Sequence, residues 1–370
     1  MATATEIKEK LAPKRKAKVL DKSFLSTGST LLNLALSGRI DGGIPVGSYL
    51  LFTGDSQSGK SILSNNCLAE AAINSAFDKW SLLYNNPENG LLLDVEYFFG
   101  PKLVERIQYP TDKHGEIRPS ATVEEFYYHL DDLRRAGKPF VEVLDSQDAL
   151  DSIAAEEKFK EEKAAYLKGK ETTGSYGMSK PKKHSQNLNW VNSHLERTGS
   201  ILIIINQTRD NIGFGSQYNP KTRSGGRALK FYAQFELWSS VIKQLKKRVN
   251  GKDRQIGTLC EIHVKKNRVN GHDVSVRVPI LRKFGLDDIG SCVDFLVEER
   301  HWATEGKKSD SDDATNKVII ADELDLTGKR ESLIEQIEEG NMEQELRLVC
   351  QKVWDSIDAQ CCPKRKPRYV

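Results

Sequence analysis

The chain has 370 residues, 38% of them hydrophobic, which suffices for one large buried core with smaller appendages. It contains no apolar run as long as the ~18 residues of a membrane-spanning helix and no apolar signal core near its N-terminus, so we expect neither a membrane span nor secretion. The net charge is only +3, yet positions 243–268 hold nine Lys/Arg against two Asp/Glu, and such basic blocks favour a polyanionic partner.

The six cysteines indicate a reducing compartment. None of them belongs to a CxxC pair, so we interpret them as reduced thiols of a cytoplasmic protein. A zinc site around Cys350, Cys361 and Cys362 is the alternative reading of their spacing.

Strand and helix patterns alternate from Ser26 onward, which is typical of an α/β domain. Helices are predicted at 60–77 and 123–137, the second from apolar residues at helical spacing. The last strand of this part, GSILIIINQ, is so apolar that helices must cover both of its faces, as in a parallel sheet. The predicted strands of this part are 48–54, 90–96, 139–146 and 199–207.

Two segments interrupt this pattern. Residues 155–187 are rich in Lys, Gly and Ser, and residues 208–227 are predicted to form a 20-residue loop with four glycines. A structureless loop of that length inside a compact domain is usually functional or disordered. Beyond it we predict antiparallel strands at 258–269 and 273–284, and one or two short helices at 328–359.

These patterns divide the chain into three predicted parts. A basic N-terminal arm covers residues 1–25, a large α/β core covers 26–290, and a small C-terminal α module with a basic tail covers 291–370.

The strongest local signal lies between the strand at 48–54 and the helix at 60–77. It fits the pattern G-x-x-x-x-G-K-[ST], with the strand before it and the helix after it that this motif requires. In such a loop the backbone N–H groups wrap phosphate oxygens, the lysine binds the β- and γ-phosphates, and the hydroxyl holds Mg²⁺. The predicted ATP-binding residues are Gly54, Asp55, Ser56, Gln57, Ser58, Gly59, Lys60 and Ser61.

Two acidic residues follow hydrophobic strands and complete a nucleotide site. Asp145, at the end of VEVLD, fits the carboxylate that holds Mg²⁺ together with Ser61. Glu96, two residues after Asp94, is well placed to orient or activate the attacking water. The order of these acids after a phosphate loop favours ATP and Mg²⁺ as ligands.

Several segments occur in the order seen in RecA-type recombinases: STGSTLLNLAL, the phosphate loop, DVE, VLDS, IIINQTRDNIGFG, NPKTRSGGRALKFYA and VKKNRV. The chain resembles this family from about Ser26 to about Trp302, most specifically in NPKT…GGRALKFYA, which ordinary phosphate-loop ATPases lack. The short basic N-terminus looks more like phage-encoded members than bacterial ones. The resemblance implies a RecA-like core with a largely parallel sheet and a DNA-dependent ATPase. It also implies a filament on single-stranded DNA that pairs it with homologous double-stranded DNA.

The resemblance also assigns roles to individual residues. Glu96 resembles the catalytic glutamate, and Gln207 resembles the glutamine that senses the γ-phosphate and signals to the DNA-binding loop. Lys266 and Arg268 resemble the pair that reaches the ATP of a neighbouring subunit, although the family has Lys at the second position. The resemblance implies DNA contacts by Met178 in the first DNA-binding loop and by Ile212 in the second, which spans 208–227. The basic residues of this glycine-rich loop independently predict contacts with single-stranded DNA by Arg209, Arg223 and Arg227.

The chain departs from the family at three points. Leu103 stands where the family has the aromatic residue that stacks on adenine, and Ser56 stands where it has a glutamate within the phosphate loop. The last residues, PKRKPRYV, are basic, whereas the family's tail is acidic.

Three other functions are compatible with a phosphate loop in this fold. A hexameric replicative DNA helicase would use the same core but form closed rings and lack NPKTRSGG. A non-catalytic mediator would bind nucleotide only as a switch, and an ATPase without a nucleic-acid partner would leave the basic blocks unexplained.

Overall fold

The computed structural model describes residues 23–88, 94–168, 179–210, 221–305 and 317–365, and its described strands form one large sheet and two small ones. The large sheet contains β3 (Tyr49–Gly54), β4 (Ser81–Asn85), β5 (Ile107–Gln108), β6 (Phe140–Leu144), β7 (Ile201–Asp210), β8 (Lys221–Arg223), β9 (Phe235–Val249), β10 (Lys252–Asn267), β11 (Val274–Leu281) and β12 (Gly285–Leu286). Their order is β12-β11-β10-β9-β3-β7-β6-β4-β5, and β8 pairs with β7.

The part of this sheet from β9 to β5 is parallel. β10, β11 and β12 extend it in antiparallel register. The predicted α/β fold with a largely parallel central sheet is therefore confirmed. In the part of the chain that the structure describes, no helix combines the length and the apolar character needed to cross a membrane.

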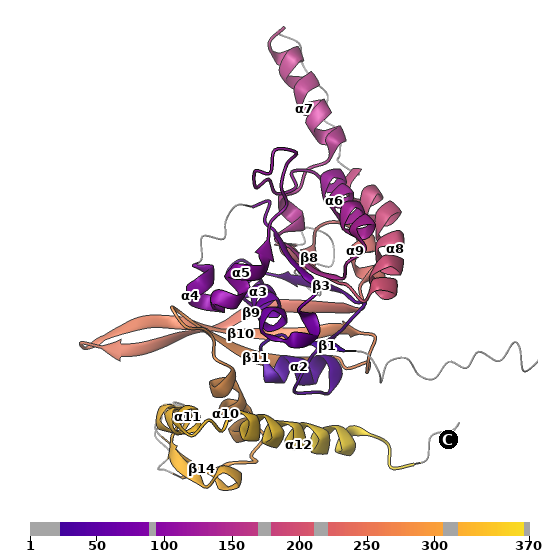
Figure 1. Ribbon diagram of the computed structural model, residues 1–370. Coiled ribbons are helices and arrows are strands. Elements are labelled where there is room, and N and C mark those ends of the chain that lie inside the picture. Colours follow the sequence, from indigo (N-terminus) through magenta and orange to yellow (C-terminus); the bar gives the residue numbers. More distant parts are fainter. Residues whose placement is uncertain (1–22, 89–93, 169–178, 211–220, 306–316, 366–370) are drawn as a thin grey trace, which may run out of the picture.

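Alternate residues of the central strands point into two cores, one on each face of the sheet. In β7, Ile201, Ile203 and Ile205 belong to the first core, while Leu202 and Ile204 belong to the second. Covering on both faces explains why β7 is apolar along its buried length. Figure 1 shows the covering helices, which are α2 (Thr30–Ser37) and α3 (Lys60–Ile73) on the first face and α6 (Val123–Ala136), α8 (Ser179–Thr198) and α9 (Arg227–Tyr232) on the second.

Most predicted elements of the core are present, and their ends have local causes. α6 begins with a capping box, in which the Thr122 hydroxyl accepts a hydrogen bond from the Glu125 N–H at 3.2 Å and the Glu125 carboxylate reaches back to the Thr122 N–H. It ends at Gly137, whose φ of 70° is the left-handed conformation that glycine adopts most easily. The predicted strands at 48–54, 139–146 and 199–207 correspond to β3, β6 and β7.

The predicted strand at 90–96 is wrong in its described part. The strand that lies between β6 and β5 is β4, and Asp94 instead caps the short helix α4 (Val95–Phe99) by accepting from the Tyr97 N–H at 3.0 Å. Residues 89–93 lie outside the described chain. SLLYN and GLLLDVE are both short apolar runs, and such runs alone do not identify which one joins the sheet.

The predicted interruption at 155–187 contains regular structure. The helix α7 (Ile153–Tyr166) buries none of its residues and projects away from the sheet (Figure 1). Because no face of α7 packs against the core, its sequence has no apolar stripe that would predict a helix. Its charged residues form surface contacts such as the Lys158–Glu162 ion pair at 3.3 Å. The predicted loop at 208–227 likewise contains regular structure: residues 208–210 belong to β7, residues 221–223 form β8 and pair with them, and Arg227 begins α9.

The C-terminal part contains a sheet as well as helices, so the prediction of a purely helical module is wrong. Its strands are short and partly exposed, which leaves little periodic pattern to read. The elements are α10 (Asp288–Glu298), β13 (Ala303–Glu305), β14 (Val318–Ala321), β15 (Leu326–Lys329), α11 (Arg330–Glu339) and α12 (Glu343–Cys361). Three other short elements, β1 (Phe24–Leu25), β2 (Ile44–Pro45) and α5 (Pro101–Arg106), lie in the core.

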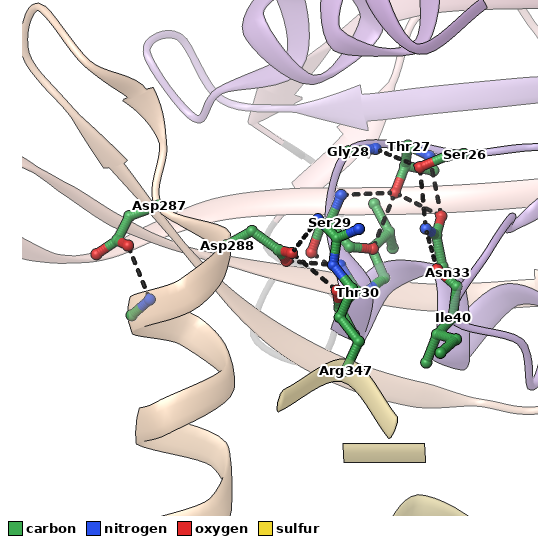
Figure 2. Close-up of polar contacts among 12 residues, drawn as sticks. Ser26, Thr27, Gly28, Ser29, Thr30, Asn33, Ile40, Asp287, Asp288 and Arg347 are labelled. Atoms are coloured by element: carbon green, nitrogen blue, oxygen red, sulfur yellow. Dashed lines mark hydrogen bonds and ion pairs between the residues drawn. The ribbon is translucent and has the colours of Figure 1, made fainter. Parts of the chain in front are cut away.

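One carboxylate joins the C-terminal part to the core. Asp288 of α10 accepts hydrogen bonds from the N–H and the hydroxyl of Thr30 at 2.7 and 2.8 Å, and Arg347 of α12 lies 3.4 Å from it (Figure 2). Burial raises the pKa of this carboxyl above its ordinary value, while Thr30 and Arg347 oppose the increase. The predicted division at residue 290 falls within α10, and the division into domains stays a prediction.

Candidate functional site

The loop between β3 and α3 is shaped by two glycines. A Cβ on Gly54 would lie 2.5 Å from the Ser239 carbonyl oxygen, and a Cβ on Gly59 would lie 2.2 Å from the Ile280 side chain. Gly59 also has a φ of +85°, which side-chain-bearing residues rarely adopt. The strand therefore turns tightly into α3, and the first N–H groups of this 14-residue helix face the loop as an anion-binding end.

Lys60 lies in this loop as a largely buried ammonium. Its side chain is 7% exposed, and its Nζ donates a hydrogen bond to the Asp55 carbonyl oxygen at 2.5 Å. Burial lowers the pKa of Lys60, and the neighbouring carboxylates of Asp145, Asp55 and Glu88 oppose that decrease. A buried cation at a helix N-terminus, reached through a tight turn that only glycines allow, fits the phosphates of a nucleotide.

The predicted Mg²⁺ ligands, Ser61 and Asp145, lie together. Asp145 follows β6 and is 5% exposed, and Tyr84 of β4 donates to its Oδ2 at 2.8 Å. Burial raises the pKa of the Asp145 carboxyl, while contacts with the Ser61 and Tyr84 hydroxyls partly lower it. A hydroxyl and a carboxylate beside a phosphate loop are oxygen ligands of the kind that Mg²⁺ prefers, so these residues fit that ion.

A carboxylate absent from the predicted site lies beside Gln207. The Gln207 side chain donates to Glu88 Oε1 at 2.8 Å, and the Ser146 hydroxyl donates to the same oxygen. The Gln207 N–H also donates to Asp148 Oδ2 at 2.7 Å. Glu88 therefore joins the end of β4, the end of β6 and the middle of β7, close enough to Lys60 and Asp145 to affect the pKa of both.

Glu96, the predicted catalytic glutamate, lies elsewhere. It is exposed in the first turn of α4, and no described residue donates a hydrogen bond to its carboxylate. An acidic residue there stabilises the helix through its dipole, which accounts for Glu96 without a catalytic role. The expected placement of Glu96 at the end of a sheet strand is wrong, and its catalytic role stays a prediction.

The base of the predicted DNA-binding loop is tied to acidic residues. Thr208 of β7 donates to Asp55 Oδ1 at 2.5 Å, and Lys221 of β8 donates to the other oxygen of the same carboxylate. Arg223 forms an ion pair with the fully buried Glu236 at 3.0 Å. These contacts hold β7 and β8 against the phosphate loop and β9.

The predicted DNA-binding residues differ in their surroundings. Arg209 is 67% exposed and lies 3.8 Å from Asp148, and Arg227 is exposed at the start of α9. Arg223 is only 16% exposed because of its contact with Glu236, so the structure gives it an internal partner. Met178 and Ile212 lie outside the described residues.

Lys266 lies near the end of β10 and Arg268 just after it, away from the end of β3 that carries the phosphate loop. Register places Lys266 level with Leu51, three residues before Gly54 ends the strand. Both side chains donate to the Phe231 carbonyl oxygen at the end of α9, each at 3.1 Å. Burial and the nearby Arg268 charge lower the pKa of Lys266 to about 8. The structure does not bring this pair to Lys60 of the same chain.

The remaining predicted residues have simpler outcomes. Ser56 and Gln57 are exposed within the loop, and the buried Ser58 hydroxyl donates to the Asp55 carbonyl oxygen at 2.7 Å. Leu103 is fully buried in the core, so it offers no surface for adenine. Within the described ranges no three His, Cys, Asp or Glu side chains gather as metal ligands, so the zinc alternative has no support there.

Sequence reasoning missed the residues whose roles depend on distant contacts. Asp55 and Lys221 are 166 positions apart, and Glu88 and Gln207 are 119 positions apart. Glu88 does follow the short apolar run SLLYN, and that run is the one local signal for a strand ending near it.

This chain is similar in sequence to known proteins. A family model described as the RecA N-terminal domain matches residues 140–287. Protein RecA of Chlorobium limicola is 30% identical over 284 residues, which are 76% of this chain and 71% of that protein. Protein RecA of Cytophaga hutchinsonii is 29% identical over 286 residues, which are 76% of this chain and 70% of that protein. Protein RecA of Bifidobacterium breve is 29% identical over 321 residues, which are 80% of this chain and 73% of that protein. This chain belongs to the RecA family of recombinases.

Proposed function

We propose that this protein is a DNA-dependent ATPase of the cytoplasm that forms a helical filament on single-stranded DNA and pairs it with homologous double-stranded DNA. The observation that supports this most is the position of Gln207. Its side chain contacts Glu88 beside Lys60 and Asp145, and the next residue along the chain begins the predicted DNA-binding loop at 208–227. One residue thus touches the nucleotide site and the DNA-binding segment.

The chain's own residues divide the work of hydrolysis. Lys60 binds the β- and γ-phosphates as a point charge, and the N–H groups at the start of α3 bind the remaining oxygens. Ser61 and Asp145 would hold Mg²⁺, which would neutralise charge on the phosphate oxygens. Tyr84 holds the Asp145 carboxylate in place through its hydrogen bond at 2.8 Å.

Glu88 is the residue that we assign to the attacking water. A carboxylate near Asp145 and Lys60 can orient a water molecule and accept its proton. Both Gln207 and Ser146 donate to the same oxygen of Glu88, Oε1, so neither of these hydrogen bonds uses Oε2. Glu96 is the alternative carboxylate, favoured by the sequence resemblance.

The second catalytic contribution comes from a neighbouring subunit. Lys266 and Arg268 lie too far from Lys60 of their own chain to contact the same phosphates, so they would act on the nucleotide of the next subunit. ATP would then lie between subunits and would favour the filament that holds DNA, and hydrolysis would release it.

The test combines hydrolysis with electron microscopy. We expect single-stranded DNA to stimulate ATP hydrolysis, and an ATP analogue with single-stranded DNA to yield open helical filaments. Closed rings would favour the hexameric helicase, and nucleotide binding without hydrolysis would favour the mediator. Hydrolysis that DNA does not change would contradict the proposed DNA partner.

A further inference from the structure

Asp55 contacts two lysines that belong to different predicted sites. Its carbonyl oxygen accepts from Lys60 Nζ at 2.5 Å, and its carboxylate accepts from Lys221 at the base of the segment 211–220. Thr208, on the opposite arm of the same hairpin, donates to the second carboxylate oxygen at 2.5 Å. Asp55 therefore contacts Lys60 of the predicted phosphate site and both strands of the β7–β8 hairpin.

The carboxylate is held in its charged form. Burial raises the pKa of Asp55, but hydrogen bonds from Lys221 and Thr208 and the charges of Lys221 and Lys60 together lower it below its ordinary value. Asp55 is 31% exposed and Lys221 is 45% exposed, so water and dissolved anions can reach the pair. An anion that approaches Lys60 or Lys221 is therefore repelled by the negative charge of Asp55.

A negatively charged residue in this place weakens the binding of both proposed ligands, ATP and single-stranded DNA. Nucleotide phosphates and DNA phosphates need the same kind of contact with Lys60 and Lys221 that Asp55 provides. At separations of a few ångströms, the Asp55 charge also repels those phosphates, because the distance is well within a Debye length.

We propose that Asp55 is an internal competitor for anions, which occupies Lys60 and Lys221 so that nucleotide and DNA each bind by displacing it. The contact is an autoinhibitory one: it holds Thr208 of β7 and Lys221 of β8 beside the phosphate loop until anionic ligands bind Lys60 and Lys221 instead. This inference rests on the proposed function for the identity of the two ligands. It adds a residue that weakens their binding instead of supporting it.

The decisive variant is Asp55→Asn. It removes the charge while its amide oxygen can still accept from Thr208, and its carbonyl oxygen still serves Lys60. We expect binding of a fluorescent oligothymidylate without nucleotide to tighten by about two- to five-fold at low salt, the range for one exposed ion pair. Binding of a fluorescent ATP analogue should tighten as well, and both gains should shrink as salt rises.

Two controls separate this contact from a general charge effect. Asp41→Asn removes the same charge from an exposed residue that pairs with Arg39 between α2 and β2, and it should leave both affinities unchanged at 0.15 M salt, where the Debye length is ≈ 8 Å. In a Lys221→Met background, Asp55→Asn should tighten DNA binding less than it does in the wild type, because the lysine that it restrains is gone and only the charge repulsion is relieved.

The outcomes distinguish the inference from the proposed function. If the wild type binds single-stranded DNA and Asp55→Asn behaves like Asp41→Asn or binds more weakly, the competitor role is wrong while the DNA partner stands. A wild type that does not bind single-stranded DNA would contradict the proposed function itself. Thermal unfolding of each variant should confirm that the effects come from a folded protein.

Discussion

At the scale of single residues, two glutamates compete for the attacking water. Glu88 lies in the nucleotide site and contacts Gln207, whereas Glu96 is exposed on α4. We expect Glu88→Gln to bind ATP but to lower its kcat for hydrolysis by about 10²–10⁴-fold, the usual contribution of a general base. Glu96→Gln should change kcat little. The opposite ranking of the two variants would return the catalytic role to Glu96.

Lys266 makes a second prediction at this scale, on pH. Burial lowers its pKa to about 8, helped by the Arg268 charge, so Lys266 is charged at neutral pH and loses its proton as pH rises through about 8. DNA-stimulated hydrolysis should therefore decline above pH 8 if the ammonium contacts phosphates. Lys266→Arg keeps its charge throughout, so that variant should remove the decline. A decline that persists in Lys266→Arg would belong to another group.

Single residues of the site were predictable from the sequence only where local geometry fixes their role. Gly54, Gly59, Lys60 and Ser61 lie within eight positions, and their spacing alone specifies a phosphate loop. Glu88 could not be identified in this way, because its role depends on pairing between β4, β6 and β7. The competitor Asp55 also reads as an ordinary loop residue until Lys221 is placed beside it.

At the scale of elements, the packing of α6 on α8 depends on a neutral histidine. His184 of α8 is fully buried and lies 2.8 Å from the Tyr127 hydroxyl of α6 through Nδ1, and burial lowers its pKa to about 4. The unfolded chain takes up a proton near pH 6.5, so stability is lost as pH falls from 6.5 toward 4. We expect the free energy of unfolding to drop by up to about 3 kcal/mol over that window.

Chemical denaturation at several pH values measures this effect. His184→Gln cannot titrate, so it should flatten the slope between pH 6.5 and 4 even though it is less stable at neutral pH. A slope equal to that of the wild type would assign the loss of stability to other groups.

The hairpin β7–β8 carries a prediction about DNA. Arg209 and Arg227 are exposed, whereas Arg223 is paired with the buried Glu236. Each phosphate contact contributes about −0.7 to the log–log salt slope for a single strand, so removing Arg209 and Arg227 together should flatten it by about 1.4. Arg223→Ala should leave the slope unchanged but lower stability, because it removes a partner from a buried charge. A slope change for Arg223→Ala alone would show that Arg223 reaches DNA.

Elements were predictable where a buried face imposes a pattern. β3, β6, β7 and α6 each bury apolar residues against the sheet or its covering helices, and their positions follow from the sequence. α7 buries nothing and therefore left no apolar stripe to recognise. The competing runs SLLYN and GLLLDVE show the other failure, since apolar content identifies a candidate strand but not its place in a sheet.

At the scale of the whole molecule, the two parts of the proposed ATPase site, the Lys60 loop and the pair Lys266 and Arg268, do not meet within one chain. Lys266 is level with Leu51, three residues before the end of β3, and it donates to carbonyl oxygens at the end of α9. At about 3.3 Å per residue, the strand alone separates it from the phosphate loop by roughly 10 Å. In the filament that we propose, a head-to-tail arrangement would place the Lys266 surface of one subunit against the Lys60 loop of the next.

Complementation between inactive subunits tests that assembly. Lys60→Ala lacks the phosphate-binding lysine but keeps Lys266 and Arg268, while Lys266→Ala/Arg268→Ala has the reverse defect. Each should hydrolyse ATP poorly alone. In an equal mixture, half of the subunits keep Lys60, and half of those face a neighbour that keeps Lys266 and Arg268. About a quarter of the wild-type rate should therefore return in a randomly ordered filament. A chain with all three substitutions mixed with Lys266→Ala/Arg268→Ala should restore nothing, because no subunit then supplies the missing pair. If the first mixture also stays inactive although filaments form, Lys266 and Arg268 act within their own chain or only support α9, and the shared site is wrong.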